Sequence, residues 1–291
     1  MRSDADPGNF VAVVTGATRG LGRGTARGLA SMGARVFVTG RDAGALENVV
    51  AEIDRNGGIG CSITCDHRDD EQIRRLFERV ADEADGRIDL LVNNAATVLG
   101  QELIAPGGFW TKTLGLADMI TLGLRSNYVA AYYAAPLMVA QHRGLIANIS
   151  FYGAASYFHG PAYGAAKAGT DKMSFDMAID LKPENVSVIS YWPGFVMTDA
   201  MKALSPEHVP ADLRASLPEW EHPEFTGRVL HALAREPDIL SCSGKAMIGA
   251  EVAARLGIRD IDGKQPISYR STMGAPLEFM VPATIPPGGD Q

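Results

Sequence analysis

An apolar run, a glycine-rich turn and a helical pattern follow one another between residues 10 and 33. Residues 10–15 form a continuous apolar run, which is typical of a parallel strand buried on both faces. The glycine-rich turn follows from Gly16 to Gly22. The next helix is predicted to turn Leu21, Ala26, Leu29 and Ala30 inward and to end at Gly33. Such a unit binds phosphate groups, because glycines let the backbone approach a pyrophosphate and the helix N-terminus offers free N–H groups.

The alternation of apolar runs and helical patterns continues along most of the chain. Further strands are predicted at residues 34–39, 60–64, 88–92, 145–149, 186–191 and 245–248, the last at a sheet edge. Helices are predicted at residues 43–56, 71–84, 123–141, 162–181 and 226–234. This alternation indicates an α/β fold with a doubly wound parallel sheet, in a single domain over residues 1–291. Its core is expected at about residues 9–256, with an irregular C-terminal extension at 257–291.

Composition restricts the classes of partner. The chain has 291 residues, with 27 Lys and Arg against 34 Asp and Glu, so its formal net charge is −7. An acidic chain without a basic run argues against nucleic acid and anionic membranes as main partners. No apolar stretch approaches the ~20 residues that span a bilayer, and the polar residues 1–9 do not resemble a signal peptide.

The three cysteines predict a reducing, cytoplasmic setting. Cys61, Cys65 and Cys242 cannot all pair with one another, and they fit small buried apolar residues. Cys61 and Cys65 lack a Cys-x-x-Cys spacing, and no His stands beside them at metal-ligand spacing. We therefore expect no metal site.

The stretch from Ser150 to Lys167 carries a hydroxyl, a phenol and an amine. Tyr163 and Lys167 are four residues apart in a helix that Pro161 could begin, so they lie one turn apart on one face. An ammonium at this position lowers a tyrosine pKa from its usual value of roughly 10. Ser150 directly follows a predicted buried strand. These groups suggest proton transfer to or from an oxygen, although the stretch read alone favours a helix with an ordinary Tyr–Lys pair.

Two arginines occupy the region where an NAD-binding enzyme carries an acid. The second predicted strand ends at Gly40-Arg41, where a carboxylate would bind the ribose 2′-hydroxyl of NAD. Arg19, in the glycine-rich turn, is a second cation on the same side. Two guanidinium groups suit a 2′-phosphate, so the sequence favours NADP(H). The alternative is that both are solvated surface arginines.

Four motifs are distributed along the chain between Thr15 and Thr198. They are Thr15-Gly16-x3-Gly20-x-Gly22, Asn93-Asn94-Ala95-Ala96, Ser150-x12-Tyr163-x3-Lys167, and Pro193-Gly194 with Thr198. Together they resemble the short-chain dehydrogenase/reductase family of the Tyr-x3-Lys type. Phe109-Trp110, Gly123-Leu124-Arg125 and the runs 240–245 and 260–263 are most similar to the family's member 1 branch. The resemblance implies a Rossmann-type fold with extended substrate loops.

The resemblance also implies an activity, which is hydride transfer between NADP(H) and a carbonyl or secondary alcohol. We expect a carbonyl reductase of an apolar ketone or aldehyde, in which Tyr163 donates the proton, Ser150 binds the carbonyl oxygen and Lys167 binds the nicotinamide ribose. The implied cofactor-binding residues are Gly16, Thr18, Arg19, Leu21, Arg41, Asp66, Asn94, Ala95, Tyr163, Lys167, Val196 and Thr198. The family usually forms homodimers or homotetramers, with the helices at 123–141 and 162–181 packed across subunits.

One position departs from the family pattern. The active-site Asn that the family usually carries early in the helix at 123–141 falls on Gly123, and Asn127 comes one turn later. A nucleotide-binding regulatory protein with weak or no turnover is therefore an alternative. A cofactor-free lyase or dehalogenase is a second, against which the glycine turn and the two arginines argue. The active-site spacing argues against a purely structural module.

The substrate pocket is expected to come from the less regular segments. Residues 199–225 are rich in Pro, His and charge, which suits a mobile flap over a site. Aromatic residues that could line an apolar pocket are Phe109, Trp110, Phe151, Tyr157 and Trp192. For any one of them, packing in the core or at an interface is the better explanation.

Overall fold

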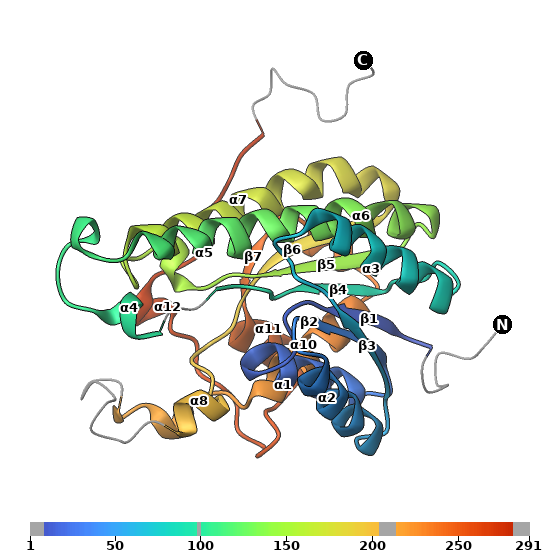
Figure 1. Ribbon diagram of the computed structural model, residues 1–291, viewed down its shortest axis with the longest axis horizontal. Coiled ribbons are helices and arrows are strands. Elements are labelled where there is room, and N and C mark those ends of the chain that lie inside the picture. The colour runs from blue at the N-terminus through green and yellow to red at the C-terminus, as the bar shows by residue number, and fades with distance from the viewer. Residues whose placement is uncertain (1–8, 98–99, 204–213, 282–291) are drawn as a thin grey trace.

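The computed structural model describes residues 9–97, 100–203 and 214–281, and within them one parallel sheet forms the centre of the protein (Figure 1). Its strands are β1 (Val11–Val14), β2 (Arg35–Gly40), β3 (Ile59–Thr64), β4 (Leu90–Asn93), β5 (Gly144–Ile149), β6 (Val186–Trp192) and β7 (Ala246–Ile248). They lie in the order β3-β2-β1-β4-β5-β6-β7, and every neighbouring pair is parallel. The predicted doubly wound sheet in a single Rossmann-type domain is therefore confirmed, with β7 at an edge.

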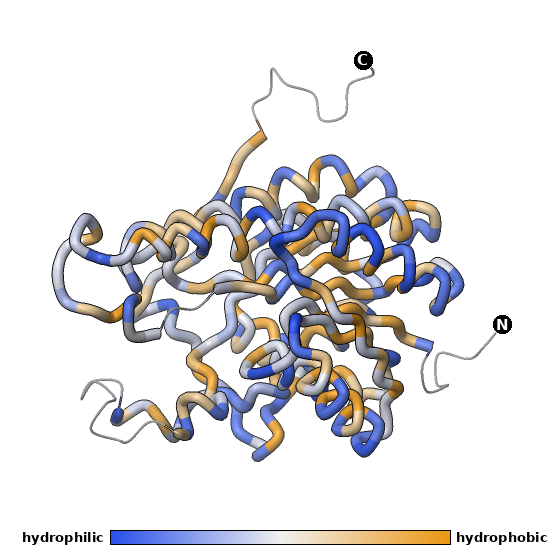
Figure 2. The backbone as a smooth tube through the Cα atoms, viewed as in Figure 1, coloured by the Kyte–Doolittle hydropathy of each residue, from blue (hydrophilic) through white to orange (hydrophobic). Residues whose placement is uncertain are grey.

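Helices cover both faces of the sheet (Figure 1). One face is covered by α3 (Asp70–Glu83), α6 (Ser126–Ala140) and α7 (Pro161–Leu181), and the other by α1 (Gly20–Ala30), α2 (Ala43–Arg55), α10 (Pro223–Ala234) and α11 (Gly249–Leu256). Figure 2 shows apolar residues along the strands and hydrophilic residues along α3. Because helices bury both sheet faces, the strands read as continuous apolar runs. In the described part of the chain, no helix is long and apolar enough to cross a membrane.

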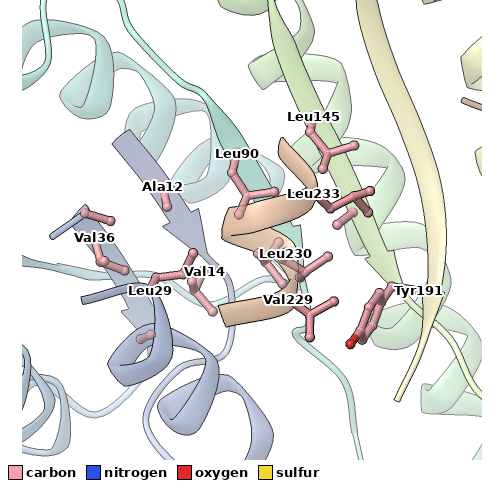
Figure 3. Packing of buried hydrophobic residues seen from close by; sticks show 14 of the residues in the cluster. Ala12, Val14, Leu29, Val36, Leu90, Leu145, Tyr191, Val229, Leu230 and Leu233 are labelled. Carbon is pink, nitrogen blue, oxygen red and sulfur yellow. The ribbon is translucent and has the colours of Figure 1, made fainter. Parts of the chain in front are cut away.

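Helix α10 supplies much of the core on one face of the sheet. Figure 3 shows Val229, Leu230 and Leu233 of α10 close to Leu90 of β4 and Leu145 of β5. These side chains are almost completely buried, and each contributes about 1.5–3 kcal/mol through burial. The core thus fixes β4 and β5, whose C-terminal ends carry the polar residues of the site.

The glycines of α1 serve the packing of this helix as well as its N-terminal turn. A Cβ on Gly28 would overlap the backbone carbonyl of Glu224 in α10, and a Cβ on Gly227 of α10 would overlap that of Thr25. The two helices therefore touch backbone to backbone. A larger residue at either glycine would push α10 away from the sheet.

The irregular segments contain short helices that the sequence did not predict. The helix predicted at 123–141 begins as the π-helical turn η3 (Thr121–Arg125) and continues as α6. The segment before it contains α4 (Gly100–Ile104), whereas residues 98–99 lie outside the described residues. The C-terminal extension forms α12 (Arg270–Met273) and is docked through Tyr269, whose backbone N–H donates to Tyr152 Oη at 3.1 Å. Residues 282–291 of the extension are outside the described residues.

The prediction of a mobile flap at residues 199–225 is wrong for the C-terminal end of this segment. Residues 204–213 lie outside the described residues, and α8 (Asp199–Lys202) precedes them. Trp220, Glu221 and Phe225 are buried, and α10 begins at Pro223. Tertiary packing therefore determines the structure of this end, despite its content of Pro, His and charge.

Candidate active site

The glycine-rich turn lies between β1 and α1 and packs against the end of β4. Gly16 has a φ of +66°, a left-handed conformation that glycine adopts without strain. A Cβ at this position would lie 2.8 Å from Ala95 Cα. The N-cap of α1 is Arg19, whose side chain makes no capping hydrogen bond, and the first turn contains no acid. The first N–H groups of α1 thus lack a side-chain acceptor, which fits an anion such as a pyrophosphate.

Asn94 and Ala95 hold this turn through hydrogen bonds. The Asn94 side chain donates to the backbone carbonyls of Thr15 at 2.9 Å and of Gly16 at 3.1 Å. The backbone N–H groups of Asn94 and Ala95 donate to Thr15 Oγ1 at 2.9 and 3.0 Å. The structure therefore brings these two residues together with the turn, and the Asn94 amide is directed at the backbone of the turn.

Arg19 and Arg41 are exposed on the same side of the molecule as the turn. Among the described residues, neither guanidinium has a hydrogen-bonded or ion-paired side chain. The end of β2 lies against the turn, since a Cβ on Gly40 would be 2.5 Å from Thr18 Cγ2. Arg41 is next to this contact in the chain. Both arginines can therefore bind an anion at the turn without first breaking an ion pair.

Asp66 follows β3, and its carboxylate is already paired. Arg68 binds it through Nη2 at 2.8 Å, Nε at 3.1 Å and the backbone N–H at 3.1 Å. These hydrogen bonds, with a smaller effect of Arg41, hold the pKa of Asp66 below its usual value. Asp66 therefore remains ionised and would have to share its oxygens with any ligand.

Ser150, Tyr163 and Lys167 converge at the C-terminal end of β5. Ser150 directly follows the strand, and its Oγ donates to the backbone carbonyl of Lys167 at 3.1 Å. Lys167 Nζ donates to the backbone carbonyl of Ile149 at 3.0 Å and lies 5.6 Å from the centroid of the Tyr163 ring. Helix α7 begins at Pro161, as predicted. These bonds join the face of α7 that carries Tyr163 and Lys167 to the end of β5.

Burial dominates the ionisation of these groups. It raises the pKa of Tyr163 above its ordinary value and lowers that of Lys167 to about 8. The expected lowering of the tyrosine pKa by Lys167 is not seen in this structure, because burial, which disfavours the charged phenolate, is the cause that shifts this pKa. At neutral pH the tyrosine is a phenol, which can donate a proton.

Gly123, at the position of the family's usual Asn, lies in the π-helical turn η3. Asn127 Nδ2 donates to the backbone carbonyl of Gly123 at 3.0 Å, and Asn93 Nδ2 donates to that of Asn127 at 3.1 Å. Asn93 also donates to Asn148 Oδ1 at 2.8 Å. Among the described residues, Asn127 makes no hydrogen bond to the serine, tyrosine or lysine of the site. It closes the π-helical turn and joins a buried chain of amides.

Val196 and Thr198 lie in the loop after β6, next to the glycine turn. Thr198 Oγ1 accepts a hydrogen bond from Met201 N at 3.3 Å and so caps α8. Its Cγ2 would lie 3.8 Å from a Cβ on Gly20. Val196 forms an isolated parallel bridge with Glu221. The structure therefore brings Thr198 to the edge of the glycine turn, whereas Val196 is held two residues earlier in the same loop by its bridge to Glu221.

Glu221 pairs with this loop, and its role was not predicted from the sequence. Its backbone N–H donates to Phe195 O at 2.8 Å, and its carbonyl accepts from Met197 N at 2.8 Å. Its Oε1 accepts from Gly194 N at 2.9 Å, and Trp220 stacks on Phe195 at 5.1 Å between ring centroids. Glu221 thus holds the backbone of the loop that carries Val196 and Thr198.

Asp171 is the second residue near the site for which no role was predicted from the sequence. It lies one turn beyond Lys167 on α7 and is only 4% exposed. Its Oδ1 accepts from Ser190 Oγ at 2.6 Å and from Trp192 Nε1 at 3.1 Å. The spacing of four from Lys167 was the one signal in the sequence that could have placed it beside the site.

The aromatic residues considered for the pocket divide into two groups. Phe151 and Trp192 are buried in an aromatic cluster, where they serve packing. Phe109 and Trp110 are 64% and 76% exposed, and Tyr157 is also exposed. Tyr163 packs against a small apolar cluster of Leu103, Met119 and Ala166, against which Leu116 also packs, and its ring lies 6.0 Å from that of Phe158 between centroids.

Three potential metal ligands gather near the end of the described chain. Ligand atoms of His222, Asp260 and Asp262 lie within 4.8 Å of one another. The backbone N–H of His222 donates to Asp260 Oδ2 at 2.8 Å, and Lys264 Nζ lies 3.4 Å from Asp262 Oδ2. Both carboxylates of the cluster are therefore already engaged within the protein, Asp260 by a backbone N–H and Asp262 by a lysine.

Known proteins similar to this chain are dehydrogenases and reductases. A profile of the family described as short chain dehydrogenase matches residues 10–208. The human protein Dehydrogenase/reductase SDR family member 1 is 39% identical over 272 residues, which cover 90% of this chain and 86% of that protein. The 3-oxoacyl-(acyl-carrier-protein) reductase of Synechocystis sp. is 31% identical over 237 residues, which cover 81% and 93%. The crystal structure of an actinorhodin polyketide ketoreductase variant with NADPH has a TM-score of 0.72 at 25% identity and covers 85% and 97%.

Proposed function

Because this chain belongs to the short-chain dehydrogenase/reductase family, and within it to the member 1 branch, we propose that it is an NADP(H)-dependent carbonyl reductase. The observation that carries the proposal is the convergence of Ser150, Tyr163 and Lys167 at the end of β5. The parallel strands β1, β4 and β5 are adjacent, so the glycine turn after β1 lies at the same edge of the sheet. A cofactor on that turn and a substrate at Tyr163 would thus be neighbours.

The three residues divide the work at the carbonyl oxygen. Tyr163 donates its phenolic proton to the oxygen as negative charge develops there, and Ser150 Oγ donates a hydrogen bond to the same oxygen. The ammonium of Lys167 stabilises the phenolate that the transfer leaves behind. When bound, the nicotinamide supplies the hydride that reduces the carbonyl carbon, or accepts one in the reverse direction.

The glycine turn and its surroundings would hold the cofactor. We assign this role to Gly16, Thr18, Arg19, Leu21, Arg41, Asp66, Asn94, Ala95, Tyr163, Lys167, Val196 and Thr198. Arg19 and Arg41, which are exposed and form no hydrogen bond or ion pair with a carboxylate among the described residues, favour the 2′-phosphate of NADP(H). Asn94 acts through the turn that it holds, and Asp66 would share its carboxylate between Arg68 and the adenine amino group.

An apolar substrate and a homo-oligomer fit the surfaces beside the site. Leu103, Leu116 and Met119 next to Tyr163 would contact the apolar part of a ketone or aldehyde. Tyr128 and Tyr132 of α6 are exposed, which favours packing of α6 and α7 against a second copy of the chain. A cytoplasmic location agrees with the three free cysteines.

The test is consumption of NADPH by the purified protein with a panel of apolar ketones and aldehydes, and of NADH in parallel. We expect turnover with several carbonyls and a preference for NADPH. A protein that binds NADPH tightly but reduces no carbonyl, and oxidises none of the matching alcohols, would be the nucleotide-binding regulator instead.

A further inference from the structure

The buried carboxylate of Asp171 lies one helical turn beyond the catalytic Lys167 on α7. Tyr163, Lys167 and Asp171 follow one another at intervals of four on α7, so they form one ladder along a single helix face. Asp171 is 4% exposed, and its Oδ1 binds Ser190 Oγ at 2.6 Å and Trp192 Nε1 at 3.1 Å. Both partners lie on β6, so the carboxylate fills the space between α7 and the sheet.

The surroundings of Asp171 stabilise its ionised form against burial. Burial raises the pKa of Asp171 above its usual value, and the hydrogen bonds from Ser190 and Trp192 and the charge of Lys167 oppose this rise in part. A buried carboxylate is costly unless such donors and a counter-charge surround it. The cation whose charge acts on it is the ammonium of Lys167, one turn away on α7, which donates to Ile149 O at 3.0 Å.

We propose that Asp171 is a positioning residue that keeps Lys167 protonated in the reduction of the carbonyl. This inference rests on the proposed function, and it adds a residue outside the motif that the family resemblance supplied. Asp171 contacts neither substrate nor cofactor in this role. It acts through the lysine, which lies one turn away on the same face of α7 and whose backbone carbonyl accepts from Ser150 Oγ.

The direction of the effect follows from the charges around the lysine. Burial lowers the pKa of Lys167 to about 8, and among the described residues Asp171 is the charged group that opposes this shift. Tyr163, the other titratable group facing Lys167, is uncharged at neutral pH because burial raises its pKa. Without the Asp171 charge, the lysine would lose its proton closer to neutrality, and the phenolate formed at Tyr163 would lose its counter-charge.

The deciding variant is Asp171→Asn, which keeps the side-chain shape and an acceptor for Ser190 and Trp192 but removes the charge. We expect the alkaline limb of the kcat profile to move to lower pH by about one unit or more, since an opposite charge at this range shifts a pKa by that amount. On the alkaline side this is about a tenfold loss of rate per unit. Asp171→Ser, a second neutral variant with a smaller side chain, should shift the limb in the same direction.

Matched controls separate the effect of the Asp171 charge from the effect of its hydrogen bonds on the structure. Asp176→Asn makes the same change at an exposed position of α7, where the carboxylate pairs with Lys172 at 2.6 Å, and it should leave the pH profile unchanged. Ser190→Ala removes a hydrogen bond to Asp171 but not its charge, and it should lower stability without moving the alkaline limb by more than a few tenths of a unit. An unmoved limb in both neutral Asp171 variants would overturn the proposal.

Direct titration of the Lys167 amine by NMR makes the test independent of turnover. Its pKa should fall in Asp171→Asn and stay unchanged in Asp176→Asn. If the native protein reduces no carbonyl, the proposed function fails, but this titration still decides whether Asp171 holds the charge of the lysine. If the native protein is active and the titration is the same in all variants, only the role of Asp171 fails.

Discussion

Gly153 lies directly against the ring of Tyr163. A Cβ built on Gly153 would be 2.6 Å from Cε1 and 2.8 Å from Cδ1 of that ring, closer than van der Waals contact allows. Gly153 belongs to the turn η4 (Tyr152–Ala154), which follows β5 and Ser150. The lack of a side chain at this position therefore gives the phenol the space that it occupies beside the serine.

Gly153→Ala is expected to displace the Tyr163 ring and to lower kcat by about 10²-fold, because a misplacement of about 1 Å can cost that much. The dissociation constant for NADPH should change far less than kcat, because the glycine turn and the two arginines, which carry most of the assigned cofactor contacts, are not displaced. Steady-state kinetics and a fluorescence titration measure the two effects. Gly44→Ala is the control, since its Cβ would meet nothing closer than Asp42 Oδ1 at 3.6 Å.

Removal of the phenolic hydroxyl tests the proton donor itself. Tyr163→Phe should lower kcat by ~10²–10⁴-fold, the usual contribution of a positioned acid. The ring would still fill its site, so the melting temperature should be preserved. Tyr157→Phe removes a hydroxyl from an exposed residue and should leave the rate unchanged. Full turnover by Tyr163→Phe would refute the assigned role.

Arg41→Asp tests the choice of cofactor. A carboxylate at this position would repel the 2′-phosphate of NADPH and accept a hydrogen bond from the 2′-hydroxyl of NADH. The loss of one charge-assisted hydrogen bond, about 1.5–3 kcal/mol, predicts a rise of about 10–100-fold in the KM for NADPH. Arg55→Asp makes the same change in charge at the far end of α2 and should have no such effect. An unchanged ratio of NADPH to NADH use would count against the 2′-phosphate assignment.

The sheet was predictable because its strands can be recognised from the local sequence pattern. Runs such as 11–14 are apolar throughout, and that pattern follows from burial on both faces. Ser150, Tyr163 and Lys167 were predictable for a related reason, since helical periodicity and the end of a strand suffice to bring them together.

Asp171 and Glu221 were not predictable in this way. In the sequence, Asp171 is one polar residue among several on α7, and periodicity does not tell which of them faces β6. Glu221 lies in a segment whose composition favours a flap, but the stacking of Trp220 on Phe195 draws it into the core. Both depend on contacts between elements distant in the chain, which local patterns do not encode.

Glu221 makes stability depend on pH. It is 2% exposed, with no partner on Oε2 among the described residues. Burial, with a smaller effect from Asp260, raises its pKa to about 8. The folded protein therefore holds a proton that the unfolded chain releases above its ordinary pKa of roughly 4.3. This raised pKa gives a contribution that is fully present below about pH 4.3 and declines until the pH passes about 8.

Glu221→Gln should remove this decline, because an amide carries no charge at any of these pH values and still accepts from Gly194 N. The free energy of unfolding of the variant, relative to the native protein, should rise between about pH 5 and pH 8 and then level off. At about 1.4 kcal/mol per unit, the total is on the order of a few kcal/mol. Urea denaturation across that range measures it, and Glu219→Gln, at an exposed site two residues away, should show no trend. A constant difference between Glu221→Gln and the native protein at all pH values would mean that Glu221 is already ionised in the folded state, held by the Gly194 N–H alone.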